Sequence, residues 1–159
     1  MGVDWTPARV RAGVDANELA ALIAEDARLN HLHGRGADFA PGVTWQQPAP
    51  ELTELWHDTN RRLRACLEIP VDGEGYWYSF RVAVIARNPL FPEEWRDAAW
   101  TTLPPARAAA EVTRWHHRYA EVRDGLRPTP AEADLEWAGD FFTWVRPWID
   151  DCYGLYLWS

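Results

Sequence analysis

The sequence predicts a mostly α-helical protein with a small β element, folded as a single domain over residues 1–159. Three observations predict this class. Apolar residues recur at helical spacing in about five segments, whereas one segment alternates with the period of a strand. With 159 residues, 47% of them apolar, the chain is also long enough to build a core without disulfides or metals. An all-α bundle is the alternative.

The first two helices have recognisable starts. The first begins at Asp15, which forms a capping box with Glu18, and Gly34 offers a left-handed stop at its end. The second begins near Pro50 and presents one apolar stripe that runs to Leu67. Both patterns are typical of helices that bury one face.

Three further helices are expected in the second half of the chain. A short one follows Pro92, and a longer one follows Pro104 and ends at Gly125 in a Schellman turn. The last begins with Thr129 as its N-cap, and Pro147 should end or kink it.

The β element is expected around 76–86, where β-branched and aromatic residues alternate with a period of two. We expect this segment to be the central strand. Its candidate partners are the short apolar segments 3–5, 43–45 and 155–158. The connection 34–50 has glycines and prolines but no clear period, so it is predicted to be a long loop.

The charged residues exclude several classes of function. The chain has no lysine, and its 16 arginines face 24 acidic residues, which gives a formal net charge of -8. Without lysine there is no Schiff base and no Walker-type phosphate site. The serines, Ser79 and Ser159, do not stand in the motif of serine hydrolases. The acidic balance argues against nucleic-acid and membrane partners, and it suits a basic partner.

The compartment is inferred from what the chain lacks. It has no apolar run of 18 residues and nothing resembling a signal peptide, and Cys66 and Cys152 form no metal or redox motif. We therefore expect a cytoplasmic protein. Arginine as the sole strong base together with abundant alanine indicates a GC-rich bacterial coding bias.

The last predicted helix has two apolar stripes, where an ordinary surface helix buries one. Several of the chain's 11 tryptophans lie on the second stripe. The stripe and its acidic border comprise Trp137, Phe141, Trp144, Trp148, Glu136 and Asp140. We interpret it as a binding face for a small ligand or a basic protein, since aromatic rings make good contact surfaces. In the competing interpretation both stripes are buried.

The sequence therefore predicts a soluble bacterial, non-catalytic binding or protein-interaction domain. It assigns no catalytic residue and no cofactor. The stretch from Thr129 to Ser159 contains six acidic residues and one arginine, Arg146, which favours a basic partner. One alternative is a small enzyme with a divalent metal between helices, held by His33, His57, His116, Asp58 and Glu54. A homodimer that buries the second stripe is the other alternative.

Overall fold

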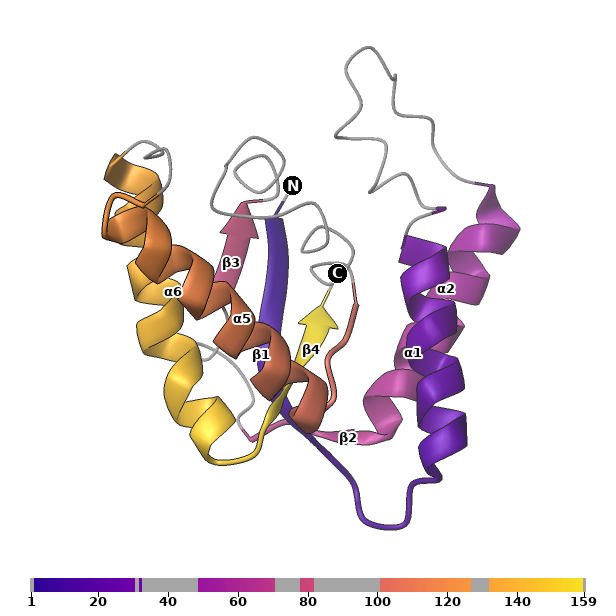
Figure 1. Cartoon of the computed structure of the whole chain (residues 1–159). Coiled ribbons are helices and arrows are strands. Elements are labelled where there is room, and N and C mark those ends of the chain that lie inside the picture. Colours follow the sequence, from indigo (N-terminus) through magenta and orange to yellow (C-terminus); the bar gives the residue numbers. More distant parts are fainter. Residues whose placement is uncertain are drawn as a thin grey trace.

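The computed structural model describes residues 2–30, 32, 49–70, 78–81, 101–126 and 132–158. These residues form three layers, with a sheet between two pairs of helices (Figure 1). On one side lie α1 (Ala16–Asn30) and α2 (Pro50–Ala65). On the other side lie α5 (Pro105–Arg123) and α6 (Glu132–Asp150). The mostly helical class with a small sheet is thus confirmed, and the all-α alternative is wrong.

The sheet has four strands, β1 (Gly2–Val10), β2 (Leu67–Glu68), β3 (Tyr78–Arg81) and β4 (Gly154–Trp158). All three other strands pair antiparallel with β1.

The central strand is therefore β1, which corrects the expectation that 76–86 is central. Among the described strands, β3 from that segment pairs with β1 alone, through Gly2–Trp5. Strand β4 also pairs with β1, with Trp5 opposite Leu157 and Pro7 opposite Leu155. Strand β1 contains Pro7, and a proline inside a segment argues against a central strand, which explains why the sequence did not indicate β1 as central.

The two faces of the sheet contribute to two separate cores. Successive side chains of a strand point to opposite faces. Accordingly Trp5, Leu155 and Leu157 join the cluster formed with α5 and α6, whereas Ala8 and Tyr156 join the cluster formed with α1 and α2. Strands β1 and β4 thus hold the two helix pairs together.

Two predicted helix ends are confirmed in detail. An Oδ1 atom of Asp15 accepts hydrogen bonds from the backbone N–H groups of Asn17 (3.0 Å) and Glu18 (2.9 Å), so Asp15 caps α1. At the end of α5, Gly125 has a φ of +76°, and the N–H of Leu126 donates to the carbonyl of Glu121 (2.9 Å), as in a Schellman turn.

Other predicted ends differ or lie elsewhere. Helix α6 continues through Pro147 to Asp150, so Pro147 does not end it. The proline removes one N–H donor, and only three residues of the helix follow it. The described residues contain four helices, where about five were expected. The helix expected after Pro92, the Thr129 cap, the strand at 43–45 and most of the loop 34–50 lie outside them.

No helix in the described part of the chain combines the length and the apolar character that crossing a bilayer requires.

Candidate functional site

The aromatic stripe expected to bind a partner lies partly inside the protein. Phe141 is fully buried, and its ring centroid is 5.7 Å from that of Trp5 in β1. Trp137 and Trp144 are half-buried and pack against the same core. The ring of the half-buried Trp148 meets that of Tyr153 edge-on, with ring centroids 5.2 Å apart. Packing within the protein thus accounts for much of this stripe.

The acidic border of the stripe, Glu136 and Asp140, is exposed on α6. The structure therefore places these two carboxylates at the surface and Phe141 in the core, so the six predicted residues do not form one open face.

The residues of the metal alternative lie on both sides of the sheet. Glu54, His57 and Asp58 belong to α2, whereas His116 belongs to α5 in the opposite layer (Figure 1). His33 lies outside the described residues. Within the ranges that the structure describes, no three His, Cys, Asp or Glu side chains are close enough to hold a metal ion.

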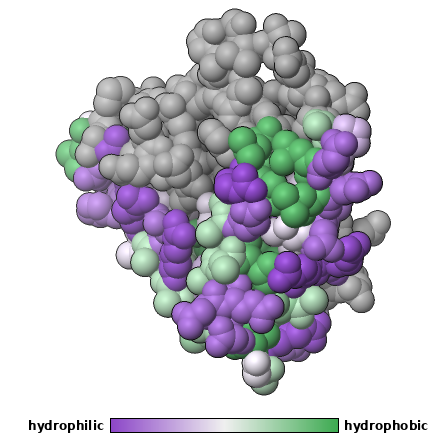
Figure 2. All heavy atoms as spheres, turned by 90° about the vertical axis from the view of Figure 1, so that its right-hand side faces the viewer, coloured by the Kyte–Doolittle hydropathy of each residue, from purple (hydrophilic) through white to green (hydrophobic). Residues whose placement is uncertain are grey.

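The outer face of α1 and α2 is mostly hydrophilic, with an apolar patch toward the upper part of the view (Figure 2). The exposed large apolar side chains of this part of the chain are Leu32 (49%) and Leu55 (44%). Two exposed apolar side chains do not by themselves indicate a binding site.

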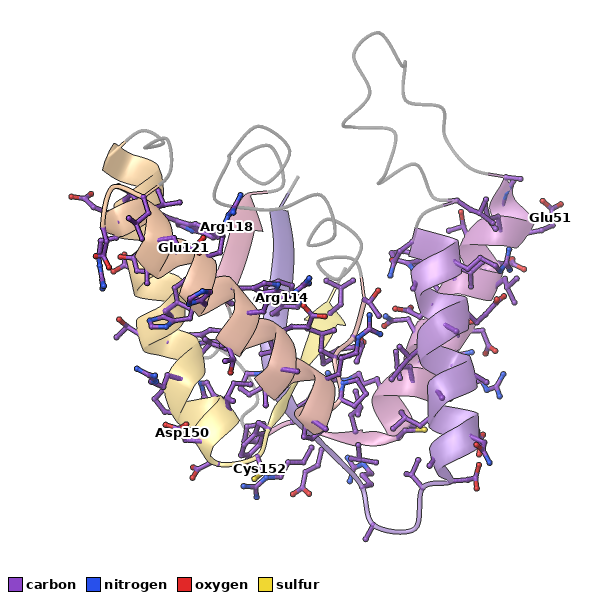
Figure 3. All side chains as sticks on the ribbon, viewed as in Figure 1. Glu51, Arg114, Arg118, Glu121, Asp150 and Cys152 are labelled. Atoms are coloured by element: carbon purple, nitrogen blue, oxygen red, sulfur yellow. The ribbon has the colours of Figure 1, made fainter. Side chains whose placement is uncertain are left out.

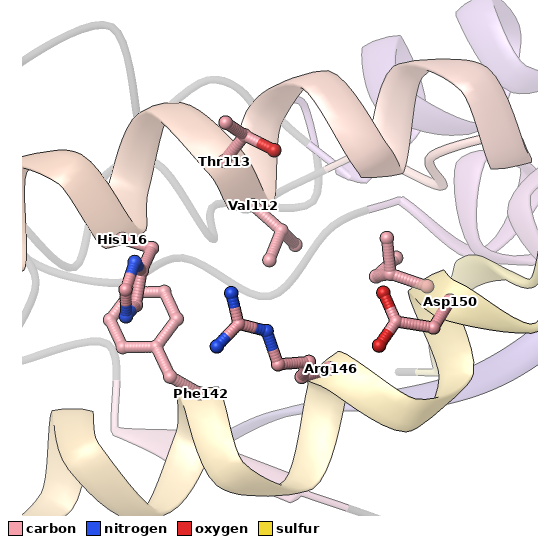
Figure 4. A pocket seen from close by; sticks show the side chains of 7 residues that line it. Val112, Thr113, His116, Phe142, Arg146 and Asp150 are labelled. Carbon is pink, nitrogen blue, oxygen red and sulfur yellow. The ribbon is translucent and has the colours of Figure 1, made fainter.

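A cavity of about 140 Å³ lies between α5 and α6 (Figure 4). Its lining comprises Val112, Thr113 and His116 of α5, and Phe142, Arg146, Ile149 and Asp150 of α6. The cavity adjoins a more open groove of about 650 Å³, which shares His116, Phe142, Arg146 and Asp150 and extends to Tyr119, Arg123, Gly139, Thr143 and Pro147. We refer to both together as the α5/α6 groove.

Helical spacing places these residues on the facing sides of the two helices. On α5, His116, Tyr119 and Arg123 stand three and four positions apart, and on α6, Phe142, Arg146 and Asp150 stand four apart. Such positions share one face of a helix. The long groove thus follows from two amphipathic helices packed side by side.

Three aromatic rings form one wall of the groove. The imidazole of His116 meets Phe142 edge-on with ring centroids 5.0 Å apart, and Phe142 lies 5.2 Å from Tyr119. The close approach of Tyr119 depends on Gly139, because a Cβ atom there would lie 3.1 Å from the tyrosine Oη. This wall places aromatic side chains next to charged groups.

His116 is held neutral at pH 7. Burial lowers the pKa of His116 below its ordinary value of 6.5, and the positive charges of Arg146 and Arg123 lower it further. The imidazole therefore acts as an aromatic wall, and it contributes no positive charge to the groove.

Other arginines of α5 already have carboxylate partners. On α5, Arg114 pairs with Glu111 (2.6 Å) and Arg118 with Glu121 (3.7 Å), and Arg114, Arg118 and Glu121 are labelled in Figure 3. At the end of α5, Arg123 donates to Asp124 (3.1 Å).

Arg146 differs from these arginines. Among the residues that the structure describes, it has neither an ion pair nor a hydrogen bond. Its guanidinium offers five N–H donors, and it points into the cavity between the two helices (Figure 4).

The two threonines of the groove offer only acceptors. The hydroxyl of Thr113 donates to the carbonyl of Ala109 (2.8 Å), and that of Thr143 donates to the carbonyl of Gly139 (2.9 Å). With both hydroxyl protons used, neither threonine donates a hydrogen bond to a ligand.

In the sequence, Arg146 is the single base of an acidic stretch that we expected to favour a basic partner. The isolation of one arginine among six acidic residues was the available signal for this site.

Comparisons of the chain with protein-family models, with curated proteins and with solved structures found no match.

Proposed function

We propose that the protein is a non-catalytic binding domain and that the α5/α6 groove holds a small ligand with an anionic group. The observation that supports this most is the guanidinium of Arg146, which has no partner among the described residues and lines a cavity beside aromatic rings. A guanidinium fork matches a carboxylate or phosphate with two parallel hydrogen bonds.

The size of the groove favours a ligand with two parts. The inner cavity of about 140 Å³ suits a compact polar group, since a liquid water molecule takes about 30 Å³. The open part, next to Tyr119 and Phe142, suits an apolar or flat portion of the same molecule.

The net charge of -8 does not oppose this proposal. Salt screens charges beyond about 8 Å at physiological ionic strength, so the groups that line the groove dominate the interaction. The proposal keeps the binding role expected from the sequence, but it moves the surface from the aromatic stripe of α6 to the side that carries Arg146.

A titration with 3-phenylpropanoate, followed by NMR chemical shifts of backbone amides, tests the proposal. This probe joins a carboxylate to an aromatic ring. We expect shifts in α5 and α6 next to the groove and a millimolar dissociation constant. Because Arg146 is exposed, we expect Arg146→Gln to weaken binding about five- to tenfold.

The matched control is Arg62→Gln, which removes an exposed arginine from α2, across the sheet, and should leave binding unchanged. The proposal is wrong if the probe shifts no amide of the groove, or if Arg146→Gln binds it as tightly as the natural chain does.

A further inference from the structure

We infer that the ligand of the α5/α6 groove is a zwitterion of the α-amino-acid class, with its carboxylate on Arg146 and its ammonium group on Asp150. This inference rests on the proposed function and adds the cationic half of the ligand.

The first support is the relation between these two side chains. Arg146 and Asp150 stand four positions apart on α6, a spacing at which opposite charges often pair. Other helical pairs, with the acid three positions before the arginine, do form, namely Glu25 with Arg28 and Asp58 with Arg61, each at 2.5 Å.

Arg146 and Asp150, both of which the structure describes, form no ion pair with each other. Both line the inner cavity and the open groove, and Figure 4 shows the two charged groups in the same space between α5 and α6. A molecule whose carboxylate and ammonium groups are attached to the same carbon is suited to contact both side chains.

The second support is the charge balance of the groove. Arg123 is paired with Asp124, and the lowered pKa of His116 leaves its imidazole neutral at pH 7. From α6, Arg146 then supplies one positive charge and Asp150 one negative charge. A zwitterion complements both charges, whereas a simple anion leaves Asp150 without a partner and meets its repulsion.

The third support is the position of Asp150 on its helix. Asp150 is the last residue of α6, where the negative end of the helix dipole disfavours a carboxylate. The carbonyls of Pro147, Trp148 and Ile149 already accept backbone hydrogen bonds, so the Asp150 carboxylate is the group that favours a cation at this point. An ammonium group bound there offsets the unfavourable position.

The aromatic wall suggests the side chain of the amino acid. The rings of His116 and Phe142 lie on one side of Arg146, and Asp150 lies on the other (Figure 4). The ring of Tyr119 contacts both of these rings. A flat ring attached one carbon away from the charged centre reaches this wall. An aromatic amino acid therefore fits better than a small polar one.

Three compounds of nearly the same shape test the inference on the unmodified protein. They are phenylalanine, 3-phenylpropanoate, which lacks the ammonium group, and 2-phenylethylamine, which lacks the carboxylate. We expect phenylalanine to bind about five- to tenfold more tightly than either, as measured by dissociation constants from NMR titrations.

A variant then assigns the ammonium contact. We expect Asp150→Asn to weaken phenylalanine about five- to tenfold, down to the affinity of 3-phenylpropanoate, and not to weaken 3-phenylpropanoate itself. The control is Asp151→Asn, which changes the neighbouring exposed carboxylate that does not line the groove. This control should leave all three affinities unchanged.

The outcomes separate the two proposals. If 3-phenylpropanoate binds through Arg146 as tightly as phenylalanine does, the zwitterion inference is wrong and anion binding stands. The inference also fails if Asp150→Asn weakens both ligands equally. If none of the three compounds binds in the groove, the proposed function fails together with the inference.

Discussion

The indole ring of Trp5 contacts aromatic side chains from two helices. Trp5 of β1 is fully buried, and its ring stacks on Trp115 of α5 with centroids 5.7 Å apart and planes 12° apart. It also meets Phe141 of α6 at 5.7 Å. One side chain thus joins three elements, and aromatic pairs of this kind add stability beyond the area that they bury.

Gly139 is the second residue with a specific role. Glycine in a helix costs about 1 kcal/mol relative to alanine, so its place inside α6 needs a reason. That reason is Tyr119, whose Oη would lie 3.1 Å from a Cβ at position 139. The glycine lets the tyrosine of the groove lie close to α6.

A double-mutant cycle checks this contact. In the Tyr119→Phe background, which lacks the hydroxyl, we expect Gly139→Ala to raise the free energy of unfolding by about 0.5–1 kcal/mol. In the natural chain the gain should be smaller by about 0.5 kcal/mol or more, because the hydroxyl has to move. Urea denaturation measures both values, and equal gains in the two backgrounds would contradict the role of the contact.

Among the elements, α1, α2 and β4 are joined by a buried chain of polar groups. Asp26 accepts from the amide of Asn30 (3.1 Å), and Asn30 accepts from the indole N–H of Trp56 (2.9 Å). A second branch runs from Asn60, which donates to Asp26 (3.4 Å), to Tyr156 of β4, whose hydroxyl donates to Asn60 (2.7 Å). Buried polar groups stabilise a fold only when each has a partner.

Two neighbouring acidic residues of α1 therefore differ in importance. Asp26→Ala leaves the buried amide of Asn30 and the half-buried amide of Asn60 without their acceptor, and we expect it to cost about 2–4 kcal/mol of the free energy of unfolding. Glu25→Ala removes an exposed ion pair with Arg28 and should cost about 0.5 kcal/mol or less. Chemical denaturation compares the two variants, and similar losses would show that the chain of polar groups does not stabilise the fold.

At the scale of the whole molecule, one thin sheet connects two helical layers that have separate cores. Within β4, Leu155 and Leu157 point to the α5 and α6 side, whereas Tyr156 points to the α1 and α2 side. Ionisation of the Tyr156 phenol therefore affects the packing of β4 against the α1 and α2 layer. Its burial and the negative charge of Asp26 raise the pKa of Tyr156 to about 12.

This pKa predicts a loss of stability in alkali. The unfolded chain releases the phenol proton near pH 10, whereas the folded chain holds it up to about pH 12. Below pH 10 the tyrosine has no effect on the pH dependence. From pH 10 to about 12 the free energy of unfolding should fall by about 1.4 kcal/mol per pH unit.

Urea denaturation between pH 8 and 11 measures this slope (about one proton released per molecule on unfolding). Tyr156→Phe should remove the contribution of this residue, whereas Tyr153→Phe, a change on the neighbouring turn, should retain it. An unchanged alkaline slope in Tyr156→Phe would contradict the assignment.

The local structure was predictable because its signals lie in adjacent residues. Asp15 caps α1 through the N–H groups of Asn17 and Glu18, two and three positions away, and Gly125 ends α5 through bonds within one turn. The pairing of the sheet was not predictable in the same way. Trp5 and Leu157 pair although they lie near opposite ends of the sequence. Pro7 within β1 argued against a central strand there.

Composition and residues a few positions apart were enough to predict the helical class, the start of α1, the end of α5 and the exclusion of lysine chemistry. The tertiary structure was needed to show which strand is central, that Phe141 belongs to the core, and that Arg146 and His116 line one groove. These features depend on contacts between distant segments, because the burial and the charge environment of a side chain are set by the elements that pack against it.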